Sequence, residues 1–225
     1  MQKKWLIPFL SVTLILPTTL SVDAAKSPTI VTKYAKSKKD LKYPYISKGL
    51  STKVRNKINV DLTDFSKFAY KNYVETENLE KKAKKSSSCK KYPSMCDYVY
   101  TTTYEKTGDH PSYLTFALYD YTYKGDAHGF SYKYAVNYSL KTGKDLSINS
   151  VLKTSSQTKK VEKYIYNKLK NDPNYFVDKQ SDIDITKDTQ YIMSKNGIRV
   201  IFQQYEIASY VMGQPEVYVP KSVYQ

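Results

Sequence analysis

The chain has 225 residues, of which 24 are tyrosines, and its 36 Lys and Arg against 21 Asp and Glu give a formal net charge of +15. A hydrophobic content of 40% excludes a disordered basic tail, and only seven glycines argue against glycine-rich low-complexity sequence and collagen. Two cysteines exclude a disulfide-dense miniprotein. The length suits one domain, or two small halves that share a core.

The first segment is typical of a secretory signal peptide. Two lysines precede the apolar run Trp5–Leu20, and small residues surround Ala24. We therefore expect residues 1–24 to be a signal peptide and the mature protein to be secreted. A membrane anchor is the alternative, but prolines break the run, and a span needs ~20 apolar residues. No second apolar stretch approaches that length, so no transmembrane segment is expected after cleavage.

The exported chain remains strongly basic. Cleavage after Ala24 removes two lysines and one aspartate, which leaves 34 of the 36 basic residues, 20 of the 21 acidic ones and a net charge of about +14. Outside a cell, nucleic acid is not the expected partner, and anionic wall polymers, membrane surfaces or acidic proteins are better candidates. The six lysines between residues 81 and 91 form either a solvated loop or a contact with an anionic polymer.

The N-terminal half, taken as residues 25–125, begins with two short strands predicted near Ile30–Tyr34 and Leu41–Tyr45. Apolar residues then recur at three- and four-residue steps from Ser51 to Lys85, which predicts a helix capped by Ser51 or Thr52. Period-two patterning predicts three long strands near Tyr98–Tyr104, Tyr113–Tyr123 and Phe130–Tyr138. Their tyrosines either fill the core and pair across strands or, where exposed in rows, stack on sugar rings.

The two cysteines, Cys89 and Cys96, enclose six residues. In an exported protein this spacing favours a local disulfide, and two free thiols are the alternative.

The C-terminal half, taken as residues 126–225, adds a second helix, a hairpin and a last strand. The spacing of apolar residues in Val161–Leu169 fits a helix that ends by Pro173. Asn196-Gly197 lies between two apolar runs and predicts a hairpin, and Glu216–Val219 is the last predicted strand. We therefore predict the α+β class: an antiparallel sheet with two main helices packed on one side, the two halves sharing one core.

Catalytic signals are few. The chain has two histidines and lacks the serine-hydrolase elbow, the paired-histidine zinc helix and the phosphate loop. We predict no catalytic residue, no metal site and no cofactor. The segment Gly125–Gly129 is the most distinctive, and Asp126 and His128 within it suit a structural turn, a ligand-contact loop, or metal binding or catalysis. A lone Asp-x-His lacks the third and fourth ligands of a metal site.

Several stretches together resemble a known family. They are Tyr43-Pro44, Lys57–Asn59, Ala117–Leu152 with its Gly-Asp-Ala-His-Gly loop, and Ile198–Val219 with Phe202–Gly213. In order and spacing they are similar to the PdaC/RsiV-like extracellular domain over nearly all the mature chain. One departure is Asp126, where the family's loop usually has a second glycine.

The resemblance implies a binding or sensing module. The family occurs beside the catalytic domain of a peptidoglycan deacetylase and forms the outer part of anti-sigma factors that bind lysozyme. We predict a secreted, cell-wall-associated, non-enzymatic protein of a Gram-positive envelope that binds peptidoglycan glycan or an anionic polymer such as teichoic acid. The candidate ligand-binding residues are Tyr123, Asp126, His128, Tyr132, Tyr205 and Tyr210.

Two other functions stay open. A module that senses or inhibits lysozyme-type hydrolases needs an acidic surface, because animal lysozyme is basic. The aspartates at 172, 178, 182, 184 and 188 cluster in sequence and keep this alternative open. The third is an enzyme acting on wall glycan through His128, Asp126 and Glu206.

Overall fold

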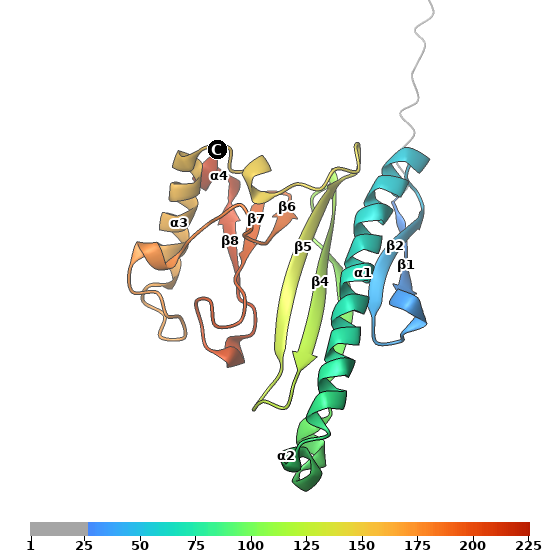
Figure 1. Ribbon diagram of the computed structural model, residues 1–225. Helices are drawn as coiled ribbons and strands as arrows, with labels where there is room; N and C mark the ends of the chain where they lie inside the picture. Colours follow the sequence, from blue (N-terminus) through green and yellow to red (C-terminus); the bar gives the residue numbers. More distant parts are fainter. Residues whose placement is uncertain (1–26) are drawn as a thin grey trace, which may run out of the picture.

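The computed structural model describes residues 27–225, so the predicted signal peptide at residues 1–24 lies outside the described residues. The strands are β1 (Thr29–Tyr34), β2 (Lys42–Lys48), β3 (Val99–Thr107), β4 (Tyr113–Tyr123), β5 (Phe130–Ser139), β6 (Tyr191–Ser194), β7 (Gly197–Ile201) and β8 (Glu216–Pro220). The α-helices are α1 (Thr52–Ala83), α2 (Ser87–Lys91), α3 (Ser155–Leu169) and α4 (Lys221–Tyr224) (Figure 1). The predicted α+β class is confirmed. Within residues 27–225, no helix combines the length and the apolar content that crossing a bilayer requires.

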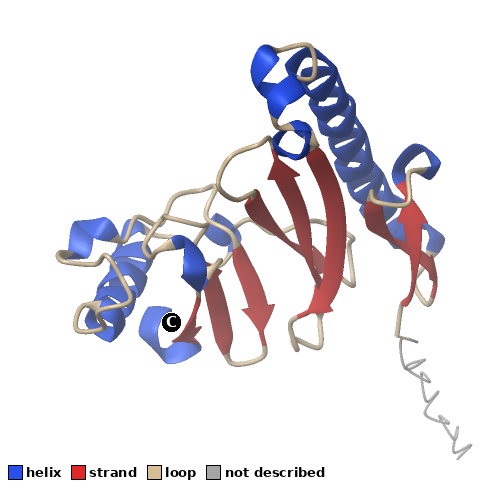
Figure 2. Ribbon diagram, turned by 90° about the horizontal axis from the view of Figure 1, so that it is seen from below, coloured by secondary structure: helices blue, strands red, loops and turns tan. Residues whose placement is uncertain are grey.

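The strands divide into three antiparallel sheets rather than the one predicted. Their orders are β1-β2, β3-β4-β5 and β6-β7-β8, and Figure 2 shows the two larger sheets beside each other with the helices around them. Each long helix packs against strands of its own half, α1 on β2 and β3 and α3 on β8. The prediction had one sheet because alternation along a strand reveals its two faces but not its neighbours.

The helix predicted from Ser51 to Lys85 is confirmed as α1. The Ser51 side chain accepts a hydrogen bond from the Val54 N–H and caps the first turn. Buried residues then recur along one stripe of the helix and pack on the even-numbered face of β4. This N-terminal core includes Val54, Ile58, Leu62, Leu114, Phe116, Leu118 and Tyr138.

The C-terminal half has its own core. The α3 helix starts with a capping box in which Thr154 and Gln157 satisfy each other's backbone N–H groups. One stripe of α3 packs against the apolar face of β6, β7 and β8. This core includes Val161, Ile165, Leu169, Ile198, Val200, Val217 and Val219.

The hairpin predicted from Asn196-Gly197 is present in the structure, but its turn lies one residue earlier in the sequence than expected. Ser194 pairs with Gly197, so the two-residue loop is Lys195–Asn196, and Gly197 is the first residue of β7. A Cβ atom on Gly197 would lie 2.2 Å from the backbone oxygen of Val219. Glycine is therefore required by the close approach of β8 rather than by the turn.

The division of the chain also differs from the predicted boundary between residues 125 and 126. That boundary falls in the turn between β4 and β5, which are neighbours in one sheet. The two large clusters of buried residues separate after β5, because Tyr138 belongs to the N-terminal core and Ile148 to the C-terminal one.

The outer edge of β5 is closed by side chains instead of another strand. The N–H groups of four alternate residues of β5 each donate to a side-chain oxygen from a later segment. These pairs are Ser131 to Gln204 (2.7 Å), Lys133 to Gln203 (3.0 Å), Ala135 to Gln190 (2.8 Å) and Asn137 to Asp145 (3.0 Å). We call this set the β5 edge. It satisfies backbone groups that an edge strand otherwise leaves free.

Asn137 joins the two cores within this edge. Its side chain is fully buried, accepts hydrogen bonds from Thr115 Oγ1 (3.0 Å) and Met193 N (2.8 Å), and donates to the Tyr191 carbonyl (2.8 Å). One amide therefore links β4, β5 and β6.

The disulfide predicted as the favoured alternative is present in the structure. Cys89 in α2 and Cys96 in the following short helix are bridged, with their Cα atoms 5.8 Å apart. Because the two half-cystines enclose only six residues, the bridge ties a local loop at the far end of α1 (Figure 1).

Candidate functional site

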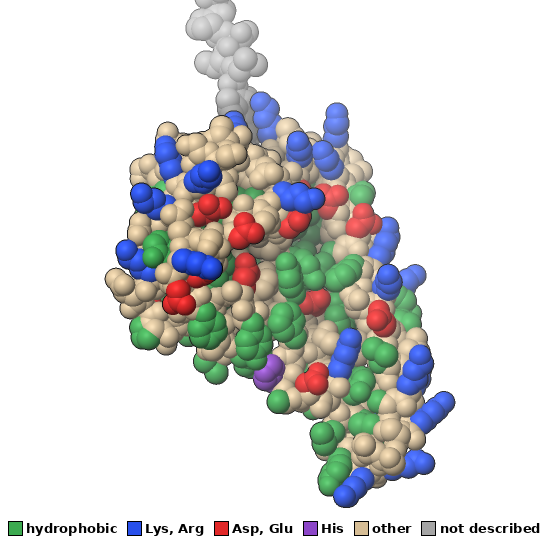
Figure 3. Space-filling model, turned by 60° about the vertical axis from the view of Figure 1, so that its left-hand side comes forward, with side chains coloured by type: hydrophobic (Ala, Val, Ile, Leu, Met, Phe, Trp, Pro, Cys, Tyr) green, Lys and Arg blue, Asp and Glu red, His purple; other side chains and the backbone are tan. Residues whose placement is uncertain are grey.

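A row of aromatic rings runs from α1 across β5 on the helix side of the central sheet. Phe65 and Phe68 each lie with their ring centroids 5.9 Å from that of Tyr134, and Tyr132 lies 4.4 Å beyond it. We call these four residues the aromatic strip. Phe68 is 40% exposed, so part of the strip meets solvent. Figure 3 shows hydrophobic side chains, tyrosines included, gathered along one face with acidic side chains beside them.

The strip continues into a cavity of about 320 Å³ whose charges are all negative. Tyr132 lines it together with Asp184, Asp188 and Glu206, and no Lys, Arg or His contributes to its wall. Burial raises the pKa of Glu206, nearby Asp184 raises it further, and the hydrogen bond from the Gln203 N–H opposes the rise. We call this the acidic cavity. Its carboxylates are unneutralised in a chain of net charge +15.

Asp120, on the neighbouring strand β4, holds Tyr132 and Tyr134 of the aromatic strip in position. Its carboxylate accepts hydrogen bonds from the Tyr100 hydroxyl (3.3 Å), the Tyr134 hydroxyl (3.3 Å) and the Tyr132 N–H (3.1 Å). Burial raises the pKa of Asp120 despite these donors. Burial and the nearby Asp120 charge likewise raise the pKa of the Tyr134 phenol. The ring of Tyr134 is therefore held by packing on one side and by a carboxylate on the other.

A second aromatic cluster lies at the turn between β4 and β5. The His128 ring stacks on Tyr210, with centroids 3.8 Å apart and planes at 19°. Its Nδ1 is 3.1 Å from the Gly129 carbonyl, which can only accept, so Nδ1 carries the proton. The Nε2 atom then accepts from the Tyr205 hydroxyl at 2.9 Å. Tyr205 is 52% exposed and has a left-handed backbone with φ 66°.

The structure divides the predicted ligand-binding residues into groups. His128, Tyr205 and Tyr210 lie together, whereas Tyr132 lines the acidic cavity. Tyr123 pairs with Val99, so it lies on the face of the sheet opposite that of Tyr132, which pairs with Asp120. Asp126 is exposed in the turn, and within residues 27–225 its side chain makes neither an ion pair nor a hydrogen bond.

Within residues 27–225, no hydrogen bond joins the three residues of the enzyme alternative, Asp126, His128 and Glu206, to one another. The hydrogen bonds of His128 go to Gly129 and Tyr205, whereas the Glu206 carboxylate bonds to the Gln203 N–H. No group of three or more metal-ligating His, Cys, Asp or Glu side chains occurs in residues 27–225.

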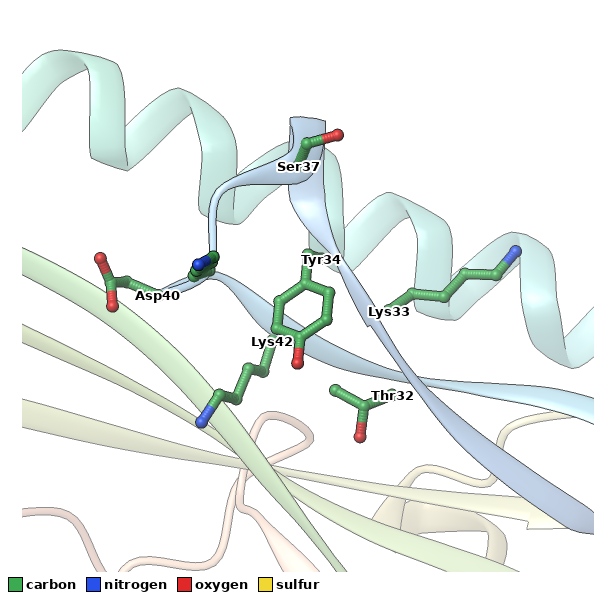
Figure 4. A pocket seen from close by; sticks show the side chains of 7 residues that line it. Thr32, Lys33, Tyr34, Ser37, Asp40 and Lys42 are labelled. Carbon is green, nitrogen blue, oxygen red and sulfur yellow. The ribbon is translucent and has the colours of Figure 1, made fainter.

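A larger and more open hollow of about 680 Å³ lies over the hairpin of β1 and β2. Figure 4 shows Lys42 extending beside the Tyr34 ring, with Asp40 and Thr32 at its edges. No residue predicted for ligand binding lines this hollow.

Several side chains of the site were not predicted from the sequence. Phe65 and Phe68 belong to the three- and four-residue spacing that predicted α1, and this spacing cannot distinguish a buried ring from one at the helix flank. Asp184 and Asp188 belong to the aspartate cluster recognised in the sequence, and Glu206 was expected only for catalysis.

Comparisons with known proteins agree with this fold. The family model described as "Deacetylase PdaC" matches residues 30–131, and the model for a protein of unknown function, DUF3298, matches residues 148–222. A crystal structure of a DUF3298 family member from Bacteroides fragilis has a TM-score of 0.60 and 16% identity, covering 88% of this chain and 89% of that chain. One from Pseudomonas aeruginosa has a TM-score of 0.50 and 14% identity, covering 88% and 91%. No curated protein sequence matches the chain.

These findings define an α+β protein built from two adjoining family segments. At such identities the structural likeness shows the fold alone, and each sequence match shows what its own segment of the chain is similar to. The chain is a PdaC/DUF3298-like domain, with the PdaC-like segment reaching from β1 into β5 and the DUF3298-like segment covering the C-terminal core.

Proposed function

We propose that this protein is a secreted, non-enzymatic binding module of the Gram-positive cell envelope, and that the aromatic strip and acidic cavity bind the glycan of peptidoglycan. The observation that supports this proposal is the continuity of partly exposed aromatic rings with unneutralised carboxylates, from Phe68 through Tyr132 to Glu206. Binding sites combine apolar and aromatic walls with a few polar groups that fix the ligand's orientation.

The chemistry of a glycan matches both parts of the site. The C–H faces of pyranose rings pack on aromatic side chains, and Phe68 and Tyr134 provide two adjoining rings on this face. Hydroxyl and amide groups of the sugars donate to the carboxylates of Asp184 and Asp188, and hydrogen bonds to ionised acceptors are roughly twice as strong as neutral ones.

Lysines supply a second, less specific attraction. They account for most of the net charge of +15 and are excluded from the acidic cavity. The proposal assigns them to contacts with an anionic wall polymer such as teichoic acid, whose phosphates attract exposed ammonium groups at short range.

The test of the glycan site is binding to purified peptidoglycan and to soluble glycan fragments. Phe68→Ala and Tyr132→Ala should each weaken binding roughly threefold to tenfold, the loss expected for one aromatic contact. Tyr92→Ala is the matched control, because Tyr92 is 52% exposed and lies within the loop closed by Cys89 and Cys96, outside the aromatic strip. Equal weakening by all three variants, or none, refutes the glycan site.

The electrostatic part is tested separately with intact cell walls at rising salt. Retention should fall as the salt concentration rises, because the Debye length shrinks from ~10 Å at 0.1 M to ~3 Å at 1 M. Retention that ignores salt removes the role of the lysines and leaves the aromatic site intact.

The acidic cavity also favours a second function, the recognition of a basic lysozyme-type hydrolase. Asp184, Asp188 and Glu206 together form the local acidic surface that such a partner requires in a basic protein. Calorimetry against lysozyme tests it, with Asp184→Asn and Asp188→Asn as the variants. The absence of heat at micromolar concentrations discards this function.

The non-enzymatic part of the proposal is supported by the hydrogen bonds of His128, which go to Gly129 and Tyr205. If wall glycan is hydrolysed or deacetylated by the purified protein and His128→Ala abolishes that activity, the protein is an enzyme. Secretion is tested by the N-terminal sequence of the protein recovered from the envelope fraction, which should begin near Ala25.

A further inference from the structure

A second concave site lies at the other end of the C-terminal half, away from the aromatic strip. Four segments that are distant in sequence meet there: the turn between β3 and β4, the residues before α3, the turn between β6 and β7, and the start of α4. They contribute His110, Lys153, Lys195 and Lys221, and the hydroxyl-bearing Ser150 and Ser194 lie between them. We call this the lysine pocket.

The lysine pocket concentrates the positive charge of three lysines, and Gln225, the last residue of the sequence, also lines it. No Asp or Glu side chain lines it. The ion pairs in the described part of the chain join other residues and include none of Lys153, Lys195 or Lys221. The carboxylate of Asp109 accepts the backbone N–H of Lys195 at 2.9 Å, so it fixes the turn that carries the lysine.

His110 presents a further donor. The Ser112 N–H donates to its Nδ1 at 3.2 Å, so the neutral ring carries its proton on Nε2. The ring is also held against Tyr113, with centroids 4.6 Å apart. Burial and the charge of Lys221 lower the pKa of His110, and Asp109 opposes this shift. Protonation of His110 would add another positive charge beside the lysines, and the protein therefore disfavours it as long as no anion is bound.

The size of the lysine pocket fits a small anion. Its volume is about 160 Å³, which corresponds to the liquid volume of roughly five water molecules. A single tetrahedral oxyanion fits this space, whereas a folded peptide does not. Lysine binds phosphate as a mobile point charge, so three lysines on separate segments can each reach a different oxygen.

We propose that the lysine pocket is a binding site for a phosphate group, held by Lys153, Lys195 and Lys221 with His110 Nε2 and the two serine hydroxyls as further donors. The phosphate belongs either to a small phosphomonoester or free phosphate, or to a phosphodiester of an anionic polymer. This site is independent of the proposed glycan site, because the two share no residue.

In the experiment, the full protein is titrated with inorganic phosphate and, in parallel, with a glycerol-phosphate diester oligomer. Calorimetry measures the binding, and NMR monitors the ring of His110. Wild type should bind saturably, and Lys195→Met and Lys221→Met should each weaken binding about tenfold, as for loss of a bond between charged groups. Lys160→Met on the exposed side of α3 is the matched control, because it removes the same charge outside the pocket.

A second readout distinguishes a site from general attraction. A bound phosphate should raise the pKa of His110 toward its ordinary value, because a negative charge then faces the ring alongside Lys153, Lys195, Lys221 and Asp109. Tighter binding of the oligomer assigns the pocket to a polymer, and tighter binding of inorganic phosphate assigns it to small phosphates. Absence of saturable binding by either ligand overturns the proposal. So does a Lys160→Met variant as weak as Lys195→Met, or a His110 pKa that ignores phosphate. Phe68→Ala, which tests the glycan site, should leave phosphate binding unchanged.

Discussion

Replacing Asn137 by alanine removes the side chain that joins the two cores. In the folded protein this side chain bonds to Thr115, Tyr191 and Met193, all of them buried. The variant leaves the Tyr191 carbonyl and the Met193 N–H without partners, while the Thr115 hydroxyl can rotate.

The expected loss follows from these orphaned groups. A buried polar group left unsatisfied costs ~1–3 kcal/mol, so two backbone groups and a weakened hydroxyl amount to about 3–5 kcal/mol. That is a large part of the ~5–15 kcal/mol that stabilises a typical domain. The loss should also be uneven. Amides of β6 should exchange with solvent much faster, because they depend directly on Asn137, whereas amides in the centre of β4 should change less.

Urea denaturation followed by circular dichroism measures the first effect, and amide hydrogen exchange measures the second. Asn59→Ala is the matched control, since Asn59 is also a buried asparagine and holds the N–H and carbonyl of Ile46 at 2.8 and 2.9 Å within the N-terminal core. It should lower stability without selectively exposing β6. A loss below about 1 kcal/mol for Asn137→Ala, or identical exchange patterns for the two variants, would refute the role of Asn137 as the junction.

Three further outcomes are expected. Removing the Cys89–Cys96 bridge by double substitution with serine should lower the free energy of unfolding by only about 2 kcal/mol, because the closed loop is short; a loss above ~4 kcal/mol in urea titrations contradicts this. Since burial raises the pKa of Asp120 above 3.8 in the folded state, the stabilisation from its protonated form is complete below pH 3.8 and declines as the pH rises through the folded pKa. Asp120→Asn should flatten this decline when the free energy of unfolding is measured from acid to neutral pH. An unchanged dependence on pH would show that Asp120 is not its source. Gln203→Leu should cost about 1–3 kcal/mol and speed exchange of the Lys133 amide, because both backbone groups of Lys133 lose their partner; unaltered protection shows that the β5 edge does not depend on Gln203.

The parts of the fold that depend on local period were predictable. The alternation in Tyr113–Tyr123 separates the two faces of a strand, and the spacing from Val54 to Tyr73 marks the buried stripe of a helix, so the strand β4 and the helix α1 follow from the sequence. The β5 edge does not follow, because the side-chain oxygens of Gln190, Gln203 and Gln204 meet β5 only after the whole C-terminal half has folded. No periodic pattern in the sequence indicates that glutamine side chains will accept the hydrogen bonds that a neighbouring strand would otherwise accept.

The candidate site was predictable in composition but not in arrangement. His128, Tyr205 and Tyr210 were grouped through the family resemblance, and the structure places them together. Tyr123 and Tyr132 were grouped for the same reason, yet lie on opposite faces. Their separation depends on the register of β4 against β5, which is set by the turn between them and not by either strand alone.

The way β5 is closed also determines which intermediate is vulnerable while the chain is being made. Synthesis delivers β3, β4 and β5 well before Gln190, Gln203 and Gln204, so for that interval the outer N–H groups of β5 form an open edge that can pair with another copy. A shortened chain that ends after the short helix Ile148–Ser150 keeps its apolar N-terminal core but loses three of the four side chains that cap the β5 edge. Such a fragment should assemble edge to edge into oligomers. The C-terminal half therefore also protects the N-terminal half from self-association.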